Sequence, residues 1–486
     1  MEVQHRGRED AVYNNRPHYL TGAPVQLYHP VFAKFIREIS CPVEAGDLAH
    51  EELEEAARFI DVSLDFFRDE TLRQKYLNDL DGTLGKLASG QIVVDARVIK
   101  PDGTTTVFCK SARREAVVRI VELKNEVGEG DSDPIMQAEC GFVLICSSEM
   151  VAPSLLVTLA HAQLPFLQYK PFRDVSCCPM FLVGVAGPNL AVSGAVFTER
   201  FVSQRLTDYI YLGPLPLPRG GGELALSHRI RRVAQIFRAL KICTSELEDY
   251  YKSLELPPAP ASRSQRSQSR GVSRSPAPIP SQSVLRKVPP PHFQAYTVDN
   301  RTYKIEYTER LDRYFPSKTV FKGTIECEGD EGKAKCDVVI KFTDRYGKEA
   351  HKLLAGMSLA PKLWYCEYEK SVEMYVVVMD YVRGKQAGRP LTEKAHIDEL
   401  RRAVDALHGG GYVHGDLRGP NVLIAADGPK LIDFDWCGEA GVARYPADIN
   451  LGSDIEWHDG VYRDGLIQKD HDEHMFSKLM QEPSPA

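Results

Sequence analysis

One segment makes it improbable that this chain folds as a single domain. The stretch PPAPASRSQRSQSRGVSRSPAPIPSQSVLRKVPPP, from Pro257 to Pro291, is rich in Pro, Ser and Arg and contains no acidic and no aromatic residue. Burial of so few apolar side chains does not offset the entropy lost on ordering, so we expect a disordered linker over residues 257–292. The 486 residues therefore divide into a part before the linker and a part after it.

Composition narrows the class of protein. The formal net charge is -7, so any nucleic-acid binding has to come from a local basic face. The most apolar stretch, residues 177–197, is broken by Gly187 and Pro188, which favours two buried strands around a turn over a membrane span. The eleven Cys are scattered and form no zinc or disulfide pattern. No apolar signal segment is visible near the start, so we expect an intracellular protein, in cytoplasm or nucleus, with no membrane partner.

The part before the linker is expected to be an α/β domain. We interpret residues 1–50 as a polar tail and residues 51–256 as the folded domain. The patterns predict a helix over 51–80, strands at 91–99 and 116–124, a helix over 133–147, two strands around Gly187 and a long last helix over 225–255.

The part after the linker, residues 293–486, is expected to be α+β and two-lobed. Strands are predicted at 302–309, 318–328, 336–343, 364–369 and 374–382, with a short helix over 346–356. A helix over 391–411 ends in three Gly, and a strand at 430–436 precedes a polar tail.

The segment YVHGDLRGPNVLI, from Tyr412 to Ile424, concentrates polar side chains between apolar ends. Phosphoryl transfer needs a Lys on the nucleotide phosphates, carboxylate and amide ligands for Mg²⁺, and a carboxylate facing the attacking hydroxyl. This part supplies such groups in order: Lys341 in the apolar strand VVIKF, Glu349 on the next helix, then Asp416, Asn421 and Asp433.

These motifs resemble those of protein kinases. VHGDLRGPNVLI is similar to the H-R-D-L-x-x-x-N catalytic loop, and LIDFDW to the D-F-G segment. The motifs VVIKF, YGKEAH, HGDLRGPN and IDFDW resemble those of the fungal-type protein kinase family of basidiomycetes, from about Phe293 to the end. The resemblance implies a two-lobed kinase-like fold, ATP and Mg²⁺ as cofactors, and a protein Ser/Thr hydroxyl as acceptor.

The resemblance also assigns roles to individual residues. Asp416 is the catalytic base or orients the hydroxyl, and Arg418 steadies the transferred phosphate. Asn421 and Asp433 bind Mg²⁺. Lys341 binds the α- and β-phosphates, and Glu349 holds it. The segment from Met379 to Val382 is the hinge beside the adenine.

Several departures from the kinase pattern leave alternatives open. No G-x-G-x-x-G precedes Lys341, Gly415 replaces the usual Arg, Asp435 stands at the D-F-G glycine, and no A-P-E follows. The HGD loop also resembles that of aminoglycoside phosphotransferases, so a small-molecule acceptor stays open. A pseudokinase that binds nucleotide without transfer stays open too, as do a Lys341 that snorkels from an edge strand and a solvated Glu349.

A second candidate site lies before the linker. Glu122 and Lys124 end an apolar strand and, being two apart, share one of its faces. With Asp95 on the neighbouring predicted strand, they resemble the site of PD-(D/E)XK nucleases, and residues 51–255 resemble nuclease-like domains fused to fungal-type kinases and crinkler-like effectors. That implies a restriction-endonuclease-like core, Mg²⁺ held by Asp95 and Glu122, and a nucleic-acid partner. Asp102 spells the motif too, but is expected to be exposed at a hairpin tip.

Three hypotheses about the second site remain open. It is an active nuclease with the kinase-like part as its regulator, a nuclease fold that has lost activity and docks a partner, or a plain salt bridge between Glu122 and Lys124.

Overall fold

The computed structural model describes residues 11–44, 46–80, 82–84, 92–94, 97–128, 132–147, 169–214, 222–256, 289–311, 317–329, 334–452 and 455–481. The chain divides into two compact units, Met1–His292 and Phe293–Ala486. Residues 257–288, nearly all of the expected linker, lie outside the described residues. None of the helices in the described ranges is long and apolar enough to cross a membrane.

The N-terminal unit is built on a mixed sheet in the order β1-β8-β7-β6-β5-β4, with β9 paired to β7. The central strands β5 and β6 run parallel, while β4 and β7 flank them antiparallel. The strands are β1 Val12–Tyr13, β4 Gly103–Cys109, β5 Arg114–Lys124, β6 Met180–Ala186, β7 Asn189–Phe197, β8 Phe201–Arg205 and β9 Ile210–Tyr211, and a separate hairpin pairs β2 Ile92–Val94 with β3 Arg97–Ile99.

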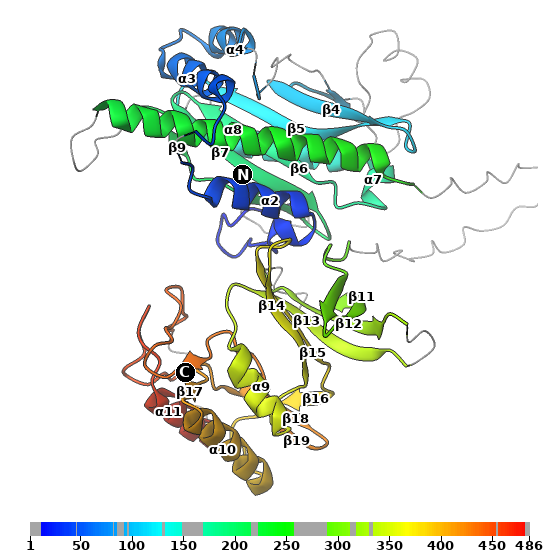
Figure 1. Cartoon of the computed structure of the whole chain (residues 1–486), viewed down its shortest axis with the longest axis vertical. Coiled ribbons are helices and arrows are strands. Elements are labelled where there is room, and N and C mark those ends of the chain that lie inside the picture. The colour runs from blue at the N-terminus through cyan, green and yellow to red at the C-terminus, as the bar shows by residue number, and fades with distance from the viewer. Residues whose placement is uncertain are drawn as a thin grey trace, which may run out of the picture. The chain divides into compact units, whose positions relative to one another are not determined.

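Helices cover both faces of the centre of this sheet. Every residue of β5 from Ala116 to Lys124 is buried, and successive residues on a strand point to opposite faces. The long helix α8 crosses the sheet, with α2 and α3 packed beside it (Figure 1). The helices are η1 Val25–Leu27, α2 Pro30–Ser40, α3 His50–Leu64, α4 Glu70–Asn78, α5 Pro134–Ser147, α7 Lys170–Arg173 and α8 Gly222–Ser253.

Three expectations for this unit are wrong. Residues 1–50 do not form a polar tail throughout, because α2 buries Phe32 and Phe35 against Phe181 of β6. The helix expected over 51–80 is two helices, since Asp69 caps a new one by accepting the Leu72 N–H at 2.9 Å. The single strand expected over 91–99 is the β2–β3 hairpin, and β4 was missed.

The C-terminal unit begins with an antiparallel sheet in the order β10-β11-β12-β13-β15-β14. An aromatic contact links the two end strands, because the rings of Tyr296 and Tyr365 stack at 4.7 Å, so the sheet curls on itself. The strands are β10 Ala295–Val298, β11 Arg301–Arg310, β12 Val320–Cys327, β13 Cys336–Thr343, β14 Leu363–Glu369 and β15 Met374–Asp380.

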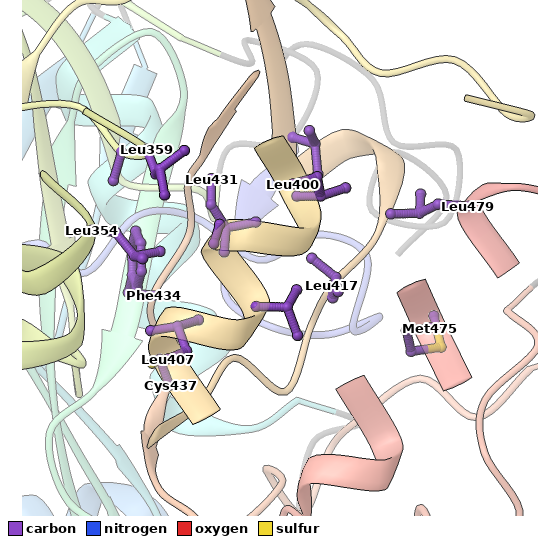
Figure 2. Packing of buried hydrophobic residues seen from close by; sticks show 14 of the residues in the cluster. Leu354, Leu359, Leu400, Leu407, Leu417, Leu431, Phe434, Cys437, Met475 and Leu479 are labelled. Carbon is purple, nitrogen blue, oxygen red and sulfur yellow. The ribbon is translucent and has the colours of Figure 1, made fainter. Parts of the chain in front are cut away.

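Much of the remainder of this unit packs around an apolar cluster (Figure 2), and a second cluster gathers Val413, Tyr445 and Ile467. Leu354 of α9, Leu407 of α10 and Met475 of α11 converge on Leu417 and Phe434, which belong to loops. The cluster therefore anchors both segments that carry the candidate catalytic residues. The elements are α9 Lys348–Gly356, β16 Gly384–Gln386, α10 Lys394–Gly409, β17 Tyr412–Val413, η3 Gly419–Asn421, β18 Val422–Ala425, β19 Gly428–Leu431, β20 Gly438–Glu439 and α11 Lys469–Leu479.

Two expectations for this unit are also wrong. The strand predicted at 430–436 ends at Leu431, and Asp433 then takes a left-handed backbone conformation with φ 67°, which no strand continues. The supposed polar tail contains α11, whose Met475 and Leu479 are buried. Their four-residue spacing is that of an amphipathic helix.

Candidate functional site

The carboxylate of Asp416 is held inside its own loop. Arg418 donates to both carboxylate oxygens, with Nη2 at 2.9 Å from Oδ2. Asn421 Nδ2 donates to Oδ2 at 2.7 Å and to the Asp416 carbonyl at 2.8 Å. Both Asp416 and Asn421 are buried, while Leu417 between them points into the apolar cluster (Figure 2). The local sequence thus presents one oriented carboxylate, backed by an amide and a guanidinium.

The backbone of this loop is held by a residue from α11. Asp472, 1% exposed, accepts the backbone N–H of His414 at 2.7 Å and of Gly415 at 2.9 Å. Gly415 has φ 80°, and a Cβ there would lie 2.9 Å from Ile467 Cδ1, so a larger residue is strained and crowded. The absence of the usual kinase Arg at this position therefore has a steric reason.

Lys341 of β13 meets two carboxylates from the segment after β19. Its Nζ donates to Asp433 Oδ1 at 2.6 Å and forms an ion pair with Asp435 Oδ1 at 2.7 Å that lacks hydrogen-bond geometry. The expected pairing of Lys341 with Glu349 is wrong. Glu349 has a side chain 62% exposed and pairs with Lys352 of its own helix at 3.2 Å.

Lys341, Asp433 and Asp435 shift one another's pKa values. Burial opposes the ammonium charge, but the two carboxylates outweigh burial and raise the pKa of Lys341. Burial works against Asp433, yet Lys341 lowers its pKa below the ordinary value. Burial, together with the nearby Asp433, raises the pKa of Asp435. Because two carboxylates surround a single ammonium, one negative charge is left that a further cation can neutralise.

The oxygen donors needed for Mg²⁺ are available here. The side-chain nitrogen of Asn421 donates to Asp416. Among the described residues, no hydrogen-bond donor reaches the side-chain oxygen Oδ1 of Asn421 or the carboxylate oxygen Oδ2 of Asp433. The backbone N–H of Ile432 donates to the Asn421 carbonyl at 2.9 Å, which places Asn421 beside the residue preceding Asp433. Carboxylate and amide oxygens are ligands that Mg²⁺ takes. Asn421 and Asp433 thus fit the ion.

The expected hinge residues do not line one site. Val339 and Lys341 share a face of β13, and the register places Met379 and Val377 of β15 opposite them. Met379 is buried with Val377 in an apolar cluster on that side. Val382, after β15, lines a separate surface cavity with Asp380, Tyr381 and Lys362. Only Met379 therefore lies on the strand face that carries Lys341.

The second candidate site assembles around Glu122 in the N-terminal unit. Gln137 Nε2 of α5 donates to Glu122 Oε2 at 2.8 Å. The Asp102 carboxyl lies close enough to Glu122 to raise its pKa, and it accepts the Leu123 N–H at 2.7 Å. Lys124 Nζ pairs with Glu70 Oε2 of α4 at 3.2 Å. Three elements and the loop before β4 thus bring three acids, an amide and an ammonium together.

The acid beside Glu122 is Asp102. Asp95 lies outside the described residues, and the expectation that Asp102 is too exposed is wrong, since it is half-buried. The pairing of Gly103 with Val121 sets Asp102 against the end of β5. Burial, and then the Asp102 carboxylate, raise the pKa of Glu122 to about 9. Burial also raises the pKa of Asp102. Two adjacent buried carboxyls of this kind fit a divalent cation.

Two basic residues of the N-terminal unit bind backbone carbonyls. Arg119 is buried and donates to the Thr83 carbonyl at 2.6 Å, and Arg232 donates to the Ile39 carbonyl. Because both guanidinium groups bind backbone carbonyls of the fold, we assign neither of them to phosphate binding.

Sequence reasoning missed Asp472 and rejected Asp102, and it gave Asp435 no role. Glu70 and Gln137 were not placed in the second site either. The signal for Asp472 was present: the spacing of His471, Met475 and Leu479 marks a helix with one buried face. Glu70 had no comparable signal, because an acidic residue in a first helical turn is common.

Comparisons with known proteins point to kinases over part of the chain. No family model matches the sequence. The chain is 30% identical over 136 residues to Hormonally up-regulated neu tumor-associated kinase of Mus musculus, which covers 26% of this chain and 19% of that protein. It is 49% identical over 35 residues to Serine/threonine-protein kinase AfsK of Streptomyces griseus, which covers 7% of this chain and 4% of that protein. It thus spans about a fifth of the mouse relative's length.

Among solved structures, the chain is similar to the kinase PK-1 of the Cydia pomonella granulovirus. The sequence identity is 16%, the TM-score is 0.28, and the likeness covers 37% of this chain and 68% of that one.

Proposed function

We propose that the C-terminal unit is an ATP- and Mg²⁺-dependent protein kinase that phosphorylates a Ser/Thr hydroxyl. The observation that carries the proposal is the convergence of distant groups: Lys341 lies 2.6 Å from Asp433, 92 positions away, next to a loop that presents Asp416. The partial similarity to curated kinases supports it. A fungal-type kinase ancestry is part of the proposal and rests on the four motifs of this unit.

Each group has a chemical task in this mechanism. Asp416, oriented by Asn421, receives the proton of the acceptor hydroxyl as the oxygen attacks the γ-phosphorus, while the bond from that phosphorus to the β-phosphate oxygen breaks and ADP leaves. Lys341 binds the nucleotide phosphates, and Arg418 stabilises charge on the transferred group. Asn421 and Asp433 would hold Mg²⁺, which would supply positive charge against the nucleotide phosphates.

A groove beside the loop offers a place for the acceptor. It is lined by Leu417, Arg418 and Pro420 of the loop, by Arg389, and by Lys478 of α11. A protein segment bound there would lie next to Asp416, which is what transfer to a protein hydroxyl requires.

The test is transfer from labelled ATP by the full chain with Mg²⁺, to itself and to general acceptor proteins. Asp416→Asn should lower the rate at least about 10²-fold, because it removes the proton acceptor, while nucleotide binding persists. Asp398→Asn, an exposed carboxylate on α10, is the matched control. If Asp416→Asn transfers at the wild-type rate, this mechanism is wrong. Nucleotide binding without any transfer would identify a pseudokinase.

A second candidate function is metal-dependent cleavage of nucleic acid by the N-terminal unit. The observation that favours it is the cluster of Asp102, Glu122, Lys124, Glu70 and Gln137. The carboxyls of Asp102 and Glu122 would hold Mg²⁺, which would supply an activated water for phosphodiester hydrolysis, and Lys124 would stabilise the developing charge. Lys124→Ala should abolish Mg²⁺-dependent nicking of plasmid DNA, with Lys110→Ala as an exposed control. Nicking that survives in Lys124→Ala would exclude this site.

A further inference from the structure

We propose that Asp435, and not a glutamate of helix α9, is the residue that positions Lys341 for phosphate binding. The proposal rests on the proposed kinase function of the same site. On this proposal, the segment from Asp433 to Asp435 both supplies the carboxylate that binds the metal and positions Lys341, and helix α9 takes no part.

The position of Asp435 is fixed on the strand that carries the lysine. Asp435 forms an ion pair with Lys341 at 2.7 Å, and the side chain of Thr343 lies beside it, with its hydroxyl donating to the Arg345 carbonyl at 3.2 Å. Lys341 and Thr343 are two apart on β13 and so point to the same face. Asp435 therefore lies beside two side chains on one face of β13 and is ion-paired with one of them, which limits where the ammonium can lie.

Helix α9 cannot take over this task in its present orientation. Its inner face is set by His351, which is fully buried, bonds Tyr346 Oη and the Pro361 carbonyl at 2.8 Å each, and stacks on Phe434 at 4.5 Å. Glu349 precedes His351 by two residues, which is about 200° around a helix, so it faces away. Turning Glu349 inward would break all three contacts of His351.

The two carboxylates on Lys341 differ in a way that divides their work. The Asp433 side chain is 39% exposed and belongs to a strained, left-handed backbone, whereas the Asp435 side chain is 24% exposed. Asp433 is therefore the one free to exchange the ammonium for Mg²⁺. Asp435 stays on Lys341 and keeps it in place while the nucleotide is bound.

A double-mutant cycle on the full chain tests this, with the affinity for MgADP as the readout. Lys341→Met should weaken MgADP about tenfold in the wild-type background, since a charge-assisted contact to phosphate is lost. In the Asp435→Asn background the same change should cost less than about threefold, because the lysine is no longer positioned. In the Glu349→Gln background it should again cost about tenfold.

Adenosine, which has no phosphate, is the internal control and should bind all variants within about twofold of wild type. A variant that misfolds would lose adenosine as well and would show an altered melting curve. Equal cost of Lys341→Met in the wild-type and Asp435→Asn backgrounds would overturn the proposal, as would a cost that disappears in Glu349→Gln. Because the cycle measures binding only, it decides the role of Asp435 even if Asp416-dependent transfer, and with it the kinase function, fails.

Discussion

At the scale of single residues, ionising the buried Glu122 carboxyl costs free energy, and a function has to explain why an acid lies there. It is 3% exposed and lies beside the Asp102 carboxyl, and these surroundings raise its pKa to about 9. A carboxyl with a raised pKa contributes stability that is fully present below its unfolded pKa near 4.5. That stability is lost as the pH rises toward 9, by up to about 1.4 kcal/mol per pH unit. A bound divalent cation would offset the free-energy cost of ionising Glu122.

Glu122→Gln should therefore stabilise the N-terminal unit more at pH 8 than at pH 5. The amide cannot ionise, so the charge that the buried site disfavours is absent at both pH values. The measurement is the melting temperature at the two pH values, without divalent cations. Glu115→Gln, on the same strand but partly exposed, is the control. An equal shift at pH 5 and pH 8 would show that Glu122 is not held protonated.

At the scale of elements, α11 explains how a short C-terminal region supports a catalytic loop. The loop has little regular structure of its own, and its backbone N–H groups need acceptors. Asp472 supplies both oxygens, and the buried Met475 and Leu479 fix the helix against the apolar cluster. The helix thus acts as the support for the HGD backbone.

Asp472→Asn should lower the transfer rate while leaving nucleotide binding largely intact. One oxygen becomes an N–H₂ group facing a backbone donor, which costs about 1–3 kcal/mol of stability. Displacement of the Asp416 carboxylate should slow transfer about 10²-fold. Both effects can be measured by melting and by single-turnover kinetics. Asp470→Asn, two residues earlier on the same helix and exposed, should change neither quantity, and an equal loss in both variants would contradict this role.

At the scale of the whole molecule, each candidate site is made entirely within one unit. Glu122, Lys124 and their partners belong to Met1–His292, and Lys341, Asp416 and Asp433 belong to Phe293–Ala486. Each unit has its own sheet and buried core. Neither site therefore needs a side chain from the other unit.

The two chemistries should accordingly separate by mutation in the full chain. Asp416→Asn should abolish phosphoryl transfer and leave Mg²⁺-dependent nicking at the wild-type rate, and Lys124→Ala should do the reverse. Both assays are run on the same preparations. Loss of nicking in Asp416→Asn, or a change in nicking on adding ATP, would show that the C-terminal unit regulates the N-terminal one.

Features that depend on neighbours along the chain could be predicted from the sequence. Asp416 and Asn421 are five residues apart in one loop, and their contact follows from that spacing. Glu122 and Lys124 share a strand face because the side-chain period of a strand is two. The apolar strands β5, β6, β7 and β13 and the helices α5, α8, α9 and α10 were predicted for the same reason, since their periodicity is local.

Only the tertiary structure decided which of several chemically equal side chains meet. Asp435 rather than Glu349 reaches Lys341, because the packing of His351 sets the rotation of α9. Asp102 adjoins Glu122 through the register of β4 with β5, and Asp472 reaches the loop through the docking of α11. The physical reason is that local spacing sets the face on which a side chain lies. Its partner across the core depends on the rotation, register and packing of whole elements.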